Sequence, residues 1–437
     1  MNSAIGILRR RIFAALLMGA TLAFSAQAVE RGFTSLYDGK TLDGWRAVGK
    51  QGPGYVPMGD IIDCPADGGG NLFTEKEYEN FVFRFEFKLS TNANNGIGIR
   101  APFQGDAAYM GMEIQVLDDS GPEYTKLRPE QYHGSVYDVA AARRGSLKPV
   151  GQWNTEEIVA DWRHIKVTVN GKVIVDTNLN DVSDPKTLFK HPGMLRERGH
   201  IGFLGHGTHV QFRNVRVKEL PSRAKENKPQ AGFKALYNGK DLKGWKGLVE
   251  SPAKRAKMSP EDLKTAQAKA DEKMRAHWKS EKGIIEFDGK GDSLCTAKDY
   301  ADFELFVDWK ILAKGDSGIY LRGSPQVQIW EANSPGQKNP PVGSGGLYNN
   351  QKNPADPIAF GDKPVGEWNH FRILMVGEKV TVYLNDTLVV NNTTLENYWE
   401  RNLPIYPSGQ IELQNHGNNL YFKNVYVREI TAKPAQH

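Results

Sequence analysis

Large apolar residues occupy every second position over two long segments of the chain. In segment 81–89, phenylalanines and a leucine occupy every second position, and segment 303–311 repeats this pattern with other large apolar side chains. A period of two is typical of a strand with one face in the core. Shorter alternating segments at 165–169 and 380–384 end in the turn sequences NGK and LND, which predict β-hairpins. The pattern therefore predicts an antiparallel β-sandwich.

The same domain occurs twice in the chain. The sequence GFTSLYDGKTLDGW at 32–45 returns as GFKALYNGKDLKGW at 232–245, KPVGQWN returns as KPVGEWN, and FRNVRVKEL returns as FKNVYVREI. A repeat of this length is a whole domain rather than a solenoid unit. We expect a first domain over 29–220, a linker over 221–231 and a second domain over 232–437.

The second copy carries an insertion at about 259–278 that has a helical pattern. Ser259 suits an N-cap and Pro260 suits the first helical position. Leu263, Ala266, Ala270 and Met274 form a narrow apolar stripe. We therefore expect a surface helix that packs on the second domain or across the junction.

The first residues have the composition of an export signal. Three arginines precede the apolar run IFAALLMGATLAF, and SAQA provides a small-x-small cleavage pattern. We expect a signal peptide over residues 1–28, a mature chain that begins near Val29, and a periplasmic or secreted location. The sequence RRIF also fits a twin-arginine signal, so both export routes stay open.

Without this leader the chain has 53 basic residues against 51 acidic ones, a net charge of +2. The basic tract that nucleic-acid binding needs is missing, and no second apolar run has membrane length. The two cysteines correspond to phenylalanines between the copies, Cys64 to Phe287 and Cys295 to Phe73. We expect buried, unpaired thiols rather than a disulfide.

The sequence NNGIGIR at 94–100 is unusual for a strand, because two glycines remove side chains from one face. The second copy, DSGIYLR, keeps Gly96 as a glycine and Arg100 as Arg322, but it has Tyr320 at the position of Gly98. The tyrosine argues against a bend of the shared fold that requires glycine at that position. Our interpretation is a bare floor beside Arg100 in the first copy and an aromatic platform in the second.

Further on, MEIQVLDD places Glu113 and Gln115 on one strand face, with Asp118 at the strand end. The second copy has Gln326 in place of Glu113, while it keeps Gln328 and an acidic Glu331. A glutamate that only one copy has cannot be required by the shared fold. Histidines also recur: His206 and His416 lie in HG turns, whereas His133 has no counterpart.

Taken together, the motifs LYDGKTLDGW, NGIGIRAP, MEIQVLDD, YHGSVY, KPVGQWN and HG…FRNVRV resemble the 3-keto-disaccharide hydrolase-like domain family. The second copy matches through LYNGKDLKGW, GDSGIYLRGSPQVQIWE and GGLYNNQ, so the resemblance covers the mature chain as a tandem pair. It implies a concanavalin-like jelly roll in each half. It also implies an exported enzyme that acts on glycosides oxidised at sugar C3.

Such a substrate defines what the site must do. A ketone at C3 acidifies the hydrogen on C2, a base removes it, and the enolate expels the aglycone from C1. Addition of water then gives net hydrolysis. The site needs a base near C2 and a donor at the ketone oxygen, but not the paired carboxylates of an ordinary glycosidase.

The candidate residues follow from these motifs. The catalytic candidates are His206, Glu113, Asp118, His416 and Glu331. The substrate-binding candidates are Arg100, Gln115, His133, Tyr137, Trp153, Arg322, Gln328, Tyr320 and Tyr348. No cofactor is indicated; a divalent metal on His206, Glu113 and Asp118 stays open, although no H-x-H or HExxH spacing supports one.

Two hypotheses remain. In the first, at least one copy cleaves 3-keto-glycosides, either with a division of labour between the copies or with both active. In the second, the chain is a non-catalytic tandem carbohydrate-binding protein, a role that jelly rolls often have. Each candidate also has a structural alternative: an arginine in an ion pair, a turn histidine bonded to backbone, or a tryptophan buried at a strand entry.

Overall fold

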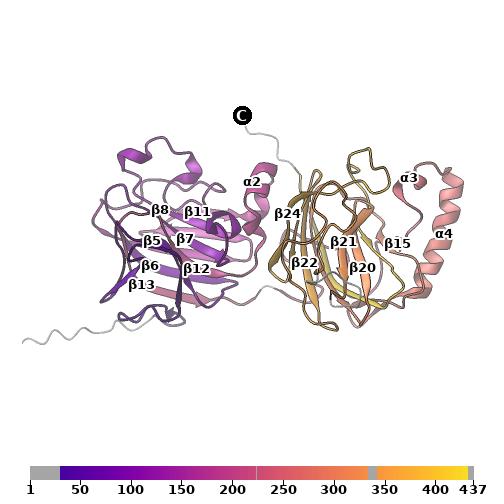
Figure 1. Cartoon of the computed structure of the whole chain (residues 1–437), viewed down its shortest axis with the longest axis horizontal. Helices are drawn as coiled ribbons and strands as arrows, with labels where there is room; N and C mark the ends of the chain where they lie inside the picture. The colour runs from indigo at the N-terminus through magenta and orange to yellow at the C-terminus, as the bar shows by residue number, and fades with distance from the viewer. Residues whose placement is uncertain (1–29, 223, 333–341, 432–437) are drawn as a thin grey trace, which may run out of the picture.

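The computed structural model describes residues 30–222, 224–332 and 342–431, which form two β-rich halves side by side (Figure 1). The expected signal peptide lies outside these residues. Each half contains one eight-stranded and one five-stranded antiparallel sheet. The predicted pair of jelly-roll β-sandwiches is therefore confirmed, including the short helical insertion in the second.

In the first half, the eight-stranded sheet has the order β11-β10-β9-β6-β13-β4-β3, with β1 paired to β13. Its strands are β1 (Thr34–Ser35), β3 (Val56–Met58), β4 (Ile61–Cys64), β6 (Phe81–Leu89), β9 (Trp153–Asp161), β10 (His164–Val169), β11 (Lys172–Asn178) and β13 (Val210–Glu219). The five-stranded sheet has the order β2-β5-β12-β7-β8. Its strands are β2 (Trp45–Gln51), β5 (Gly69–Thr74), β7 (Asn94–Ala101), β8 (Met112–Leu117) and β12 (His200–Gly205).

The second half repeats this arrangement. Its eight-stranded sheet comprises β14 (Lys234–Ala235), β16 (Trp278–Glu281), β17 (Ile284–Phe287), β19 (Phe303–Ile311), β22 (Asn369–Val376), β23 (Lys379–Leu384), β24 (Thr387–Thr394) and β26 (Leu420–Glu429). Its five-stranded sheet has the order β15-β18-β25-β20-β21, with β15 (Trp245–Gly247), β18 (Leu294–Thr296), β20 (Asp316–Leu321), β21 (Ser324–Trp330) and β25 (Glu412–Leu413). The helices are α1 (Ala107–Met110), α2 (Pro185–Lys190), α3 (Pro252–Arg255) and α4 (Pro260–His277).

The alternating segments lie at the centre of each sandwich. In β6 every second side chain is buried, from Phe81 to Leu89, and the intervening ones are partly exposed. Each buried apolar side chain of this size contributes about 1.5–3 kcal/mol. The buried faces of both sheets pack into one large core per half, and the first core also includes Leu374, Val376, Tyr383 and Ile430 of the second half. The period of two in the sequence thus decides which face is inside.

The predicted hairpin turns are also present. Asn170 and Gly171 both have positive φ, as the two-residue turn between β10 and β11 requires. Asn385 and Asp386 do the same between β23 and β24. The tryptophan that ends the repeated GW motif makes an equivalent hydrogen bond in each copy. The indole N–H of Trp45 donates to the Leu36 carbonyl, and that of Trp245 donates to the Leu236 carbonyl.

Helix α4 packs beside the edge strand β15 at the far end of the second half (Figure 1). The Ser259 hydroxyl accepts from the backbone N–H of Asp262 and so caps the helix. Ala270 and Met274 are its buried residues. The stripe therefore packs on the second domain, not across the junction.

A buried ion network connects the halves. Glu304 on β19 is fully buried and accepts from Arg372 at 2.6 Å and from Arg428 at 2.7 Å. Arg372 also donates to the Leu195 carbonyl, and Arg428 donates to the Asn180 carbonyl at 3.2 Å. The acceptors lie in the first half, so the arginines hold the two halves in one orientation.

Both cysteines are buried and free, as expected from their correspondence with phenylalanines. Within residues 30–222, 224–332 and 342–431, none of the helices has the length and apolarity needed to cross a bilayer.

Candidate functional site

The five-stranded sheet of the first half brings together two of the predicted catalytic residues. Glu113 comes from β8, and His206 follows the last residue of β12. These two strands are not neighbours, because β7 lies between them. Even so, Glu113 Oε1 lies 3.8 Å from His206 Nε2, an ion-pair contact slightly longer than a hydrogen bond.

Gly96 on β7 makes this contact geometrically possible. A Cβ atom at Gly96 would lie 1.9 Å from Glu113 Oε1, far inside van der Waals contact. The backbone at Gly96 is not in the positive-φ region, so the need for glycine here is spatial rather than conformational. The missing side chain on β7 is the gap through which Glu113 reaches toward His206.

The bare floor expected at Gly98 is not empty. Gly98 pairs with Gly202 of β12, so two glycines lie side by side. A Cβ at Gly98 would meet Leu204 at 3.2 Å and Phe73 at 3.3 Å, and a Cβ at Gly202 would meet Phe73 at 2.3 Å. The protein's own apolar side chains therefore cover the strand face that the two glycines leave bare.

Burial and mutual charge both act on the Glu113–His206 pair. Burial raises the pKa of Glu113, and His206 offsets part of this effect. The Glu113 carboxylate in turn raises the pKa of His206. Glu113 Oε1 has no hydrogen-bond partner, and half of the His206 side chain is exposed. A buried carboxyl with an oxygen that accepts no hydrogen bond, next to an accessible imidazole, can exchange a proton with a ligand.

The second copy arranges the equivalent positions differently. Gln326 donates to Gln328, which donates to Asp316 at 2.8 Å. His416 is more than half exposed, and its Nδ1 lies 3.4 Å from Asp316 rather than near Gln326. The described residues of this half thus contain no counterpart of the Glu113–His206 pair.

The sequence analysis did not identify Glu412, a buried carboxyl on β25. It stands where the first copy has Gly202, and it pairs with Tyr320 on the neighbouring strand. Burial raises its pKa to about 8, partly offset by Arg255. The alignment of the copies already contained the signal, a glycine replaced by a charged residue on a strand.

The guanidinium groups of the two arginines predicted to bind substrate are hydrogen-bonded to acceptors within the protein. Arg100 is buried with a positive φ, and its guanidinium donates to the carbonyls of Glu79 and Trp162 and to the Asn80 side chain. Arg322 repeats this geometry, with the carbonyl of Ala301 as one of its acceptors. Left-handed backbone turns both side chains into the ends of the sandwiches, which accounts for their agreement between copies.

The other candidates near β8 have internal partners as well. Gln115 shares the Glu113 face, and its Oε1 accepts from the Val116 N–H. Asp118 accepts from the Asn92 N–H at 2.9 Å in the turn after the strand. Tyr137 accepts from Gln131 through its hydroxyl at 3.0 Å.

His133 lies in the core of the first half. Its Nδ1 accepts from the Leu117 N–H, and its ring lies 5.0 Å from the Phe87 ring. Burial lowers its pKa to about 3 and raises the pKa of Glu156, whose carboxylate lies 3.5 Å away. Burial therefore disfavours the charged form of both groups.

Three further candidates lie away from the Glu113–His206 pair. Trp153 is on the eight-stranded sheet, where Arg213 lies 4.1 Å from its ring centre. Glu331 accepts from the Lys314 N–H. Tyr348 is exposed and makes an edge contact with Trp330. Among the described residues, no group of three His, Cys, Asp or Glu side chains is placed to hold a metal ion.

Comparisons with known proteins agree with the resemblance. The chain matches the 3-keto-alpha-glucoside-1,2-lyase-like domain over residues 32–218 and again over 232–428. It is 28% identical to a protein named 3-keto-disaccharide hydrolase from Bacteroides thetaiotaomicron, over 43% of this chain and 79% of the relative.

Two crystal structures of proteins described as putative glycosyl hydrolases from Parabacteroides distasonis are also similar. One has 27% identity and a TM-score of 0.38, over 43% of this chain and 99% of the other. The second has 21% identity and a TM-score of 0.38, over 44% and 95%. Because the domain match extends over most of both halves, the chain belongs to the 3-keto-alpha-glucoside-1,2-lyase-like domain family, with two copies in tandem.

Proposed function

We propose that this chain is an exported carbohydrate-active enzyme whose first half cleaves 3-keto-disaccharides by elimination at C1 and C2, with or without hydration. The observation that carries the proposal is the Glu113–His206 pair, which joins a buried carboxyl of raised pKa to an accessible imidazole. The family and the name of the Bacteroides relative support the substrate class.

In this proposal Glu113 is the base. Its carboxylate takes the proton from C2, and the electron pair of that C–H bond forms the enolate with the C3 carbonyl. The enolate then collapses: C3 regains its carbonyl, a C1–C2 double bond forms, and the bond from C1 to the leaving oxygen breaks. His206, as the imidazolium, gives its proton to that oxygen. Water can then add hydroxyl to C1 and a proton to C2.

The surroundings of the pair suit these roles. A buried carboxyl with a raised pKa is a stronger base than an exposed one. The Gln115 side chain lies on the same strand face and is a candidate donor to the ketone oxygen. The described residues of the second half form no such pair, so we assign it no elimination activity.

The test uses the mature chain, begun near Val29, with 3-keto-trehalose as substrate and trehalose as the unoxidised control. We expect release of glucose from the ketone only. Glu113→Gln creates the residue of the second copy at this position, and we expect it to reduce turnover by about 10²–10⁴-fold. His416→Asn is the matched control for His206→Asn and should retain turnover.

Failure to release glucose from 3-keto-trehalose, with and without an added divalent metal, would overturn the enzyme proposal. Saturable binding of the ketone without turnover would then favour the alternative, a tandem carbohydrate-binding protein. Equal losses in His206→Asn and His416→Asn would instead place activity in both halves.

A further inference from the structure

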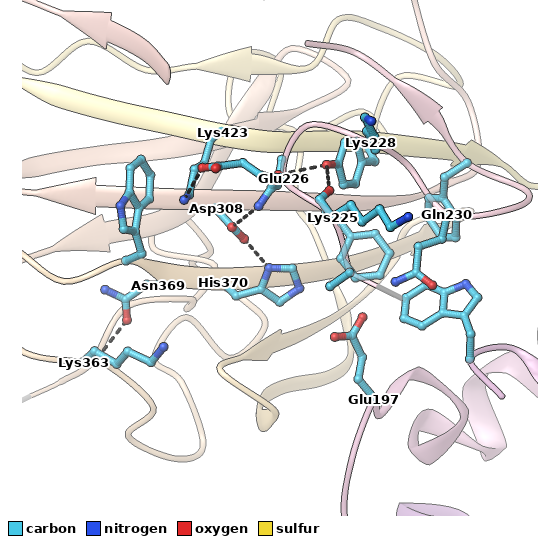
Figure 2. Close-up of a pocket in the computed structure, with 17 residues that line it drawn as sticks. Glu197, Lys225, Glu226, Lys228, Gln230, Asp308, Lys363, Asn369, His370 and Lys423 are labelled. Carbon is cyan, nitrogen blue, oxygen red and sulfur yellow. Dashed lines mark hydrogen bonds and ion pairs between the residues drawn. The ribbon is translucent and has the colours of Figure 1, made fainter. Parts of the chain in front are cut away.

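A cavity of about 400 Å³ lies where the two halves meet (Figure 2). One wall is the outer face of the second eight-stranded sheet, with Asp308, His370 and Lys423. The connecting segment 224–233 forms another wall, and Trp162 and Glu197 of the first half complete the lining. This junction cavity is separate from the Glu113–His206 pair.

Three polar atoms in the lining are buried without a hydrogen-bond partner: Trp162 Nε1, His370 Nε2 and Gln230 Oε1. The Trp162 side chain belongs to a residue that is only 8% exposed. Each unsatisfied buried polar group costs about 1–3 kcal/mol, and groups of this kind need an explanation. These two donors and one acceptor belong to residues that line the same cavity, and a polar ligand there would give them partners.

His370 can be assigned a donor role. Its Nδ1 contacts the Asp308 carboxylate. Burial disfavours the imidazolium, but Asp308 outweighs this and raises the pKa of His370 to about 9. Near neutral pH, Nδ1–H therefore donates to Asp308, and Nε2–H has no acceptor among the residues that the structure describes. Glu197 points toward the His370 side of the cavity (Figure 2).

The backbone at Trp162 is strained. It lies in the two-residue turn between β9 and β10 with φ of +58°, a value that is a true outlier for a bulky residue and costs about 1–3 kcal/mol. The second copy has Gly377 in the same turn, with φ of +56°. The first copy thus keeps a strained tryptophan where glycine fits without cost, and its ring lines the cavity.

The aromatic residues that line the cavity are not a feature that the two copies share. On the sheet that forms its wall, the second copy has Phe306, His370 and Tyr426. The first copy has Arg84, Thr155 and Arg216 at these positions. Arg84 forms surface ion pairs with Glu157 and Glu30 in that copy. The aromatic lining is therefore specific to the junction.

The charges in the cavity are largely paired internally. Lys423 contacts Glu226 at 2.6 Å, and His370 contacts Asp308. Glu197 lies 4.0 Å from Arg372, and the rings of Trp162, Phe233, Phe306 and Tyr426 pack on one another. What remains for a ligand is the outer edge of this ring cluster, two N–H donors, an amide oxygen and the Lys363 ammonium. Aromatic faces bind the C–H face of a sugar ring, and a ligand with many hydroxyl groups can both donate and accept.

A neighbouring hollow of about 770 Å³ shares Glu197, Lys363 and His370 with this cavity. It extends along the junction to Pro102 and Gln104. These residues flank Phe103, which packs against the apolar cluster of Phe73 and Leu204. The two hollows together have room for more than one sugar unit.

We propose that the junction cavity is a second carbohydrate-binding site, which holds a neutral oligosaccharide between the halves and has no part in bond cleavage. The Trp162 and His370 N–H groups and the Gln230 amide oxygen bind its hydroxyl groups. This inference does not depend on the proposed catalytic role of Glu113.

The test is calorimetric titration of the whole mature chain with trehalose and with maltotriose, which lack the ketone and are not turned over. We expect saturable binding, tighter for maltotriose. Trp162→Phe keeps the ring and removes the N–H, and it should weaken binding about 5–10-fold. Trp162→Gly reproduces the turn of the second copy and should remove the binding. Glu113→Gln should leave the junction binding intact.

Thermal melting checks that each variant is folded, and Gln230→Ala, on the connecting segment, replaces Trp162→Phe if that variant unfolds. Three results would each overturn the proposal: no heat with either sugar, binding unchanged in Trp162→Phe and Gln230→Ala, or binding lost only in Glu113→Gln. Turnover of 3-keto-trehalose is measured separately, so failure of this site and failure of the proposed function remain distinct.

Discussion

Glu113 and His206 contact each other across β7, the strand that separates their own two strands in the sheet. The contact exists because β7 has no side chain at Gly96, where a Cβ atom would overlap the Glu113 carboxylate. A glycine in the middle of a strand normally weakens it. Here it gives a buried carboxyl a path to an accessible imidazole, and this relationship leads to the first prediction.

Gly96→Ala should abolish activity while the protein still folds. The new Cβ would lie 1.9 Å from Glu113 Oε1, so the carboxyl must move away from His206. We expect a loss of turnover similar to that of Glu113→Gln, and a decrease of about 1–3 kcal/mol in the free energy of unfolding. Turnover of 3-keto-trehalose and urea unfolding measure the two effects.

The double variant Gly96→Ala, Glu113→Gln separates this explanation from general damage. If glycine acts only by making room for the carboxyl, the double variant loses no more activity than either single one. Gly318→Ala is the matched control in the second copy, where the Cβ would approach Gln326 at 2.9 Å. Losses that multiply would contradict the proposed role of Gly96.

The plot of kcat/KM against pH should be bell-shaped. Both limbs should lie at higher pH than the ordinary pKa values of a glutamate and a histidine would give. Glu113 must be ionised to act as a base, and burial raises its pKa above 4.5, so activity should fall on the acidic side above that value. His206 must be protonated, and Glu113 raises its pKa above 6.5, so the basic limb should lie above that value. Because the two groups interact, the apparent pKa values read from the limbs describe the pair rather than either residue alone. An acidic limb below 4.5 would exclude Glu113 as the base.

Glu304→Ala should destabilise the junction strongly at neutral pH. The substitution leaves Arg372 and Arg428 buried without their carboxylate, and removal of one partner from such a network costs about 3–5 kcal/mol. Urea unfolding measures the change. Removal of Glu250, which forms an exposed pair with Lys254, is the control and should change stability by less than about 1 kcal/mol.

The Glu304→Ala variant also tests how the free energy of unfolding depends on pH. Burial opposes the charged form of Glu304, but the arginines around it hold its pKa well below the ordinary value of 4.5. The stabilisation is therefore complete above that value and is lost as the pH falls below it. The stability difference between the native chain and Glu304→Ala should shrink in acid. A difference that grows in acid would contradict this account.

Neither thiol should react in the folded protein. Burial raises the pKa of Cys64 to about 11 and that of Cys295 to about 12, so almost no reactive thiolate is present near neutral pH. A disulfide-exchange reagent should therefore label no thiols under native conditions and two after unfolding in urea. A reducing agent should leave the melting temperature unchanged. Rapid native labelling would show that one of the strands opens.

Much of this fold was predictable because its signals are local. The alternation in β6, the Asn-Gly turn at 170–171 and the N-cap at Ser259 each depend on residues close in sequence. The repeated motifs then indicated two sandwiches. The placement of the candidate residues was less predictable. Sequence placed Arg100 at the end of a bare strand, but a positive φ turns its side chain away from that face.

The contact between Glu113 and His206 could not be predicted from spacing. It depends on which strands become neighbours in the sheet, and β12 and β8 lie far apart in the chain. The glycine pattern also does not reveal what covers the strand face: Phe73 and Leu204 lie against Gly98, and Phe73 lies against Gly202. The junction cavity is equally invisible in the sequence, since the turn that holds Trp162 gives no sign of the surface it will meet.

The gap at Gly96 also limits how such a domain can diverge. A side chain at this position would occupy the space that the carboxyl of Glu113 needs. The second copy has Gln326 in place of the glutamate and also has a glycine, Gly318, so its strand has the same vacancy. The second half therefore has room for a glutamate at position 326, which a single codon change would introduce.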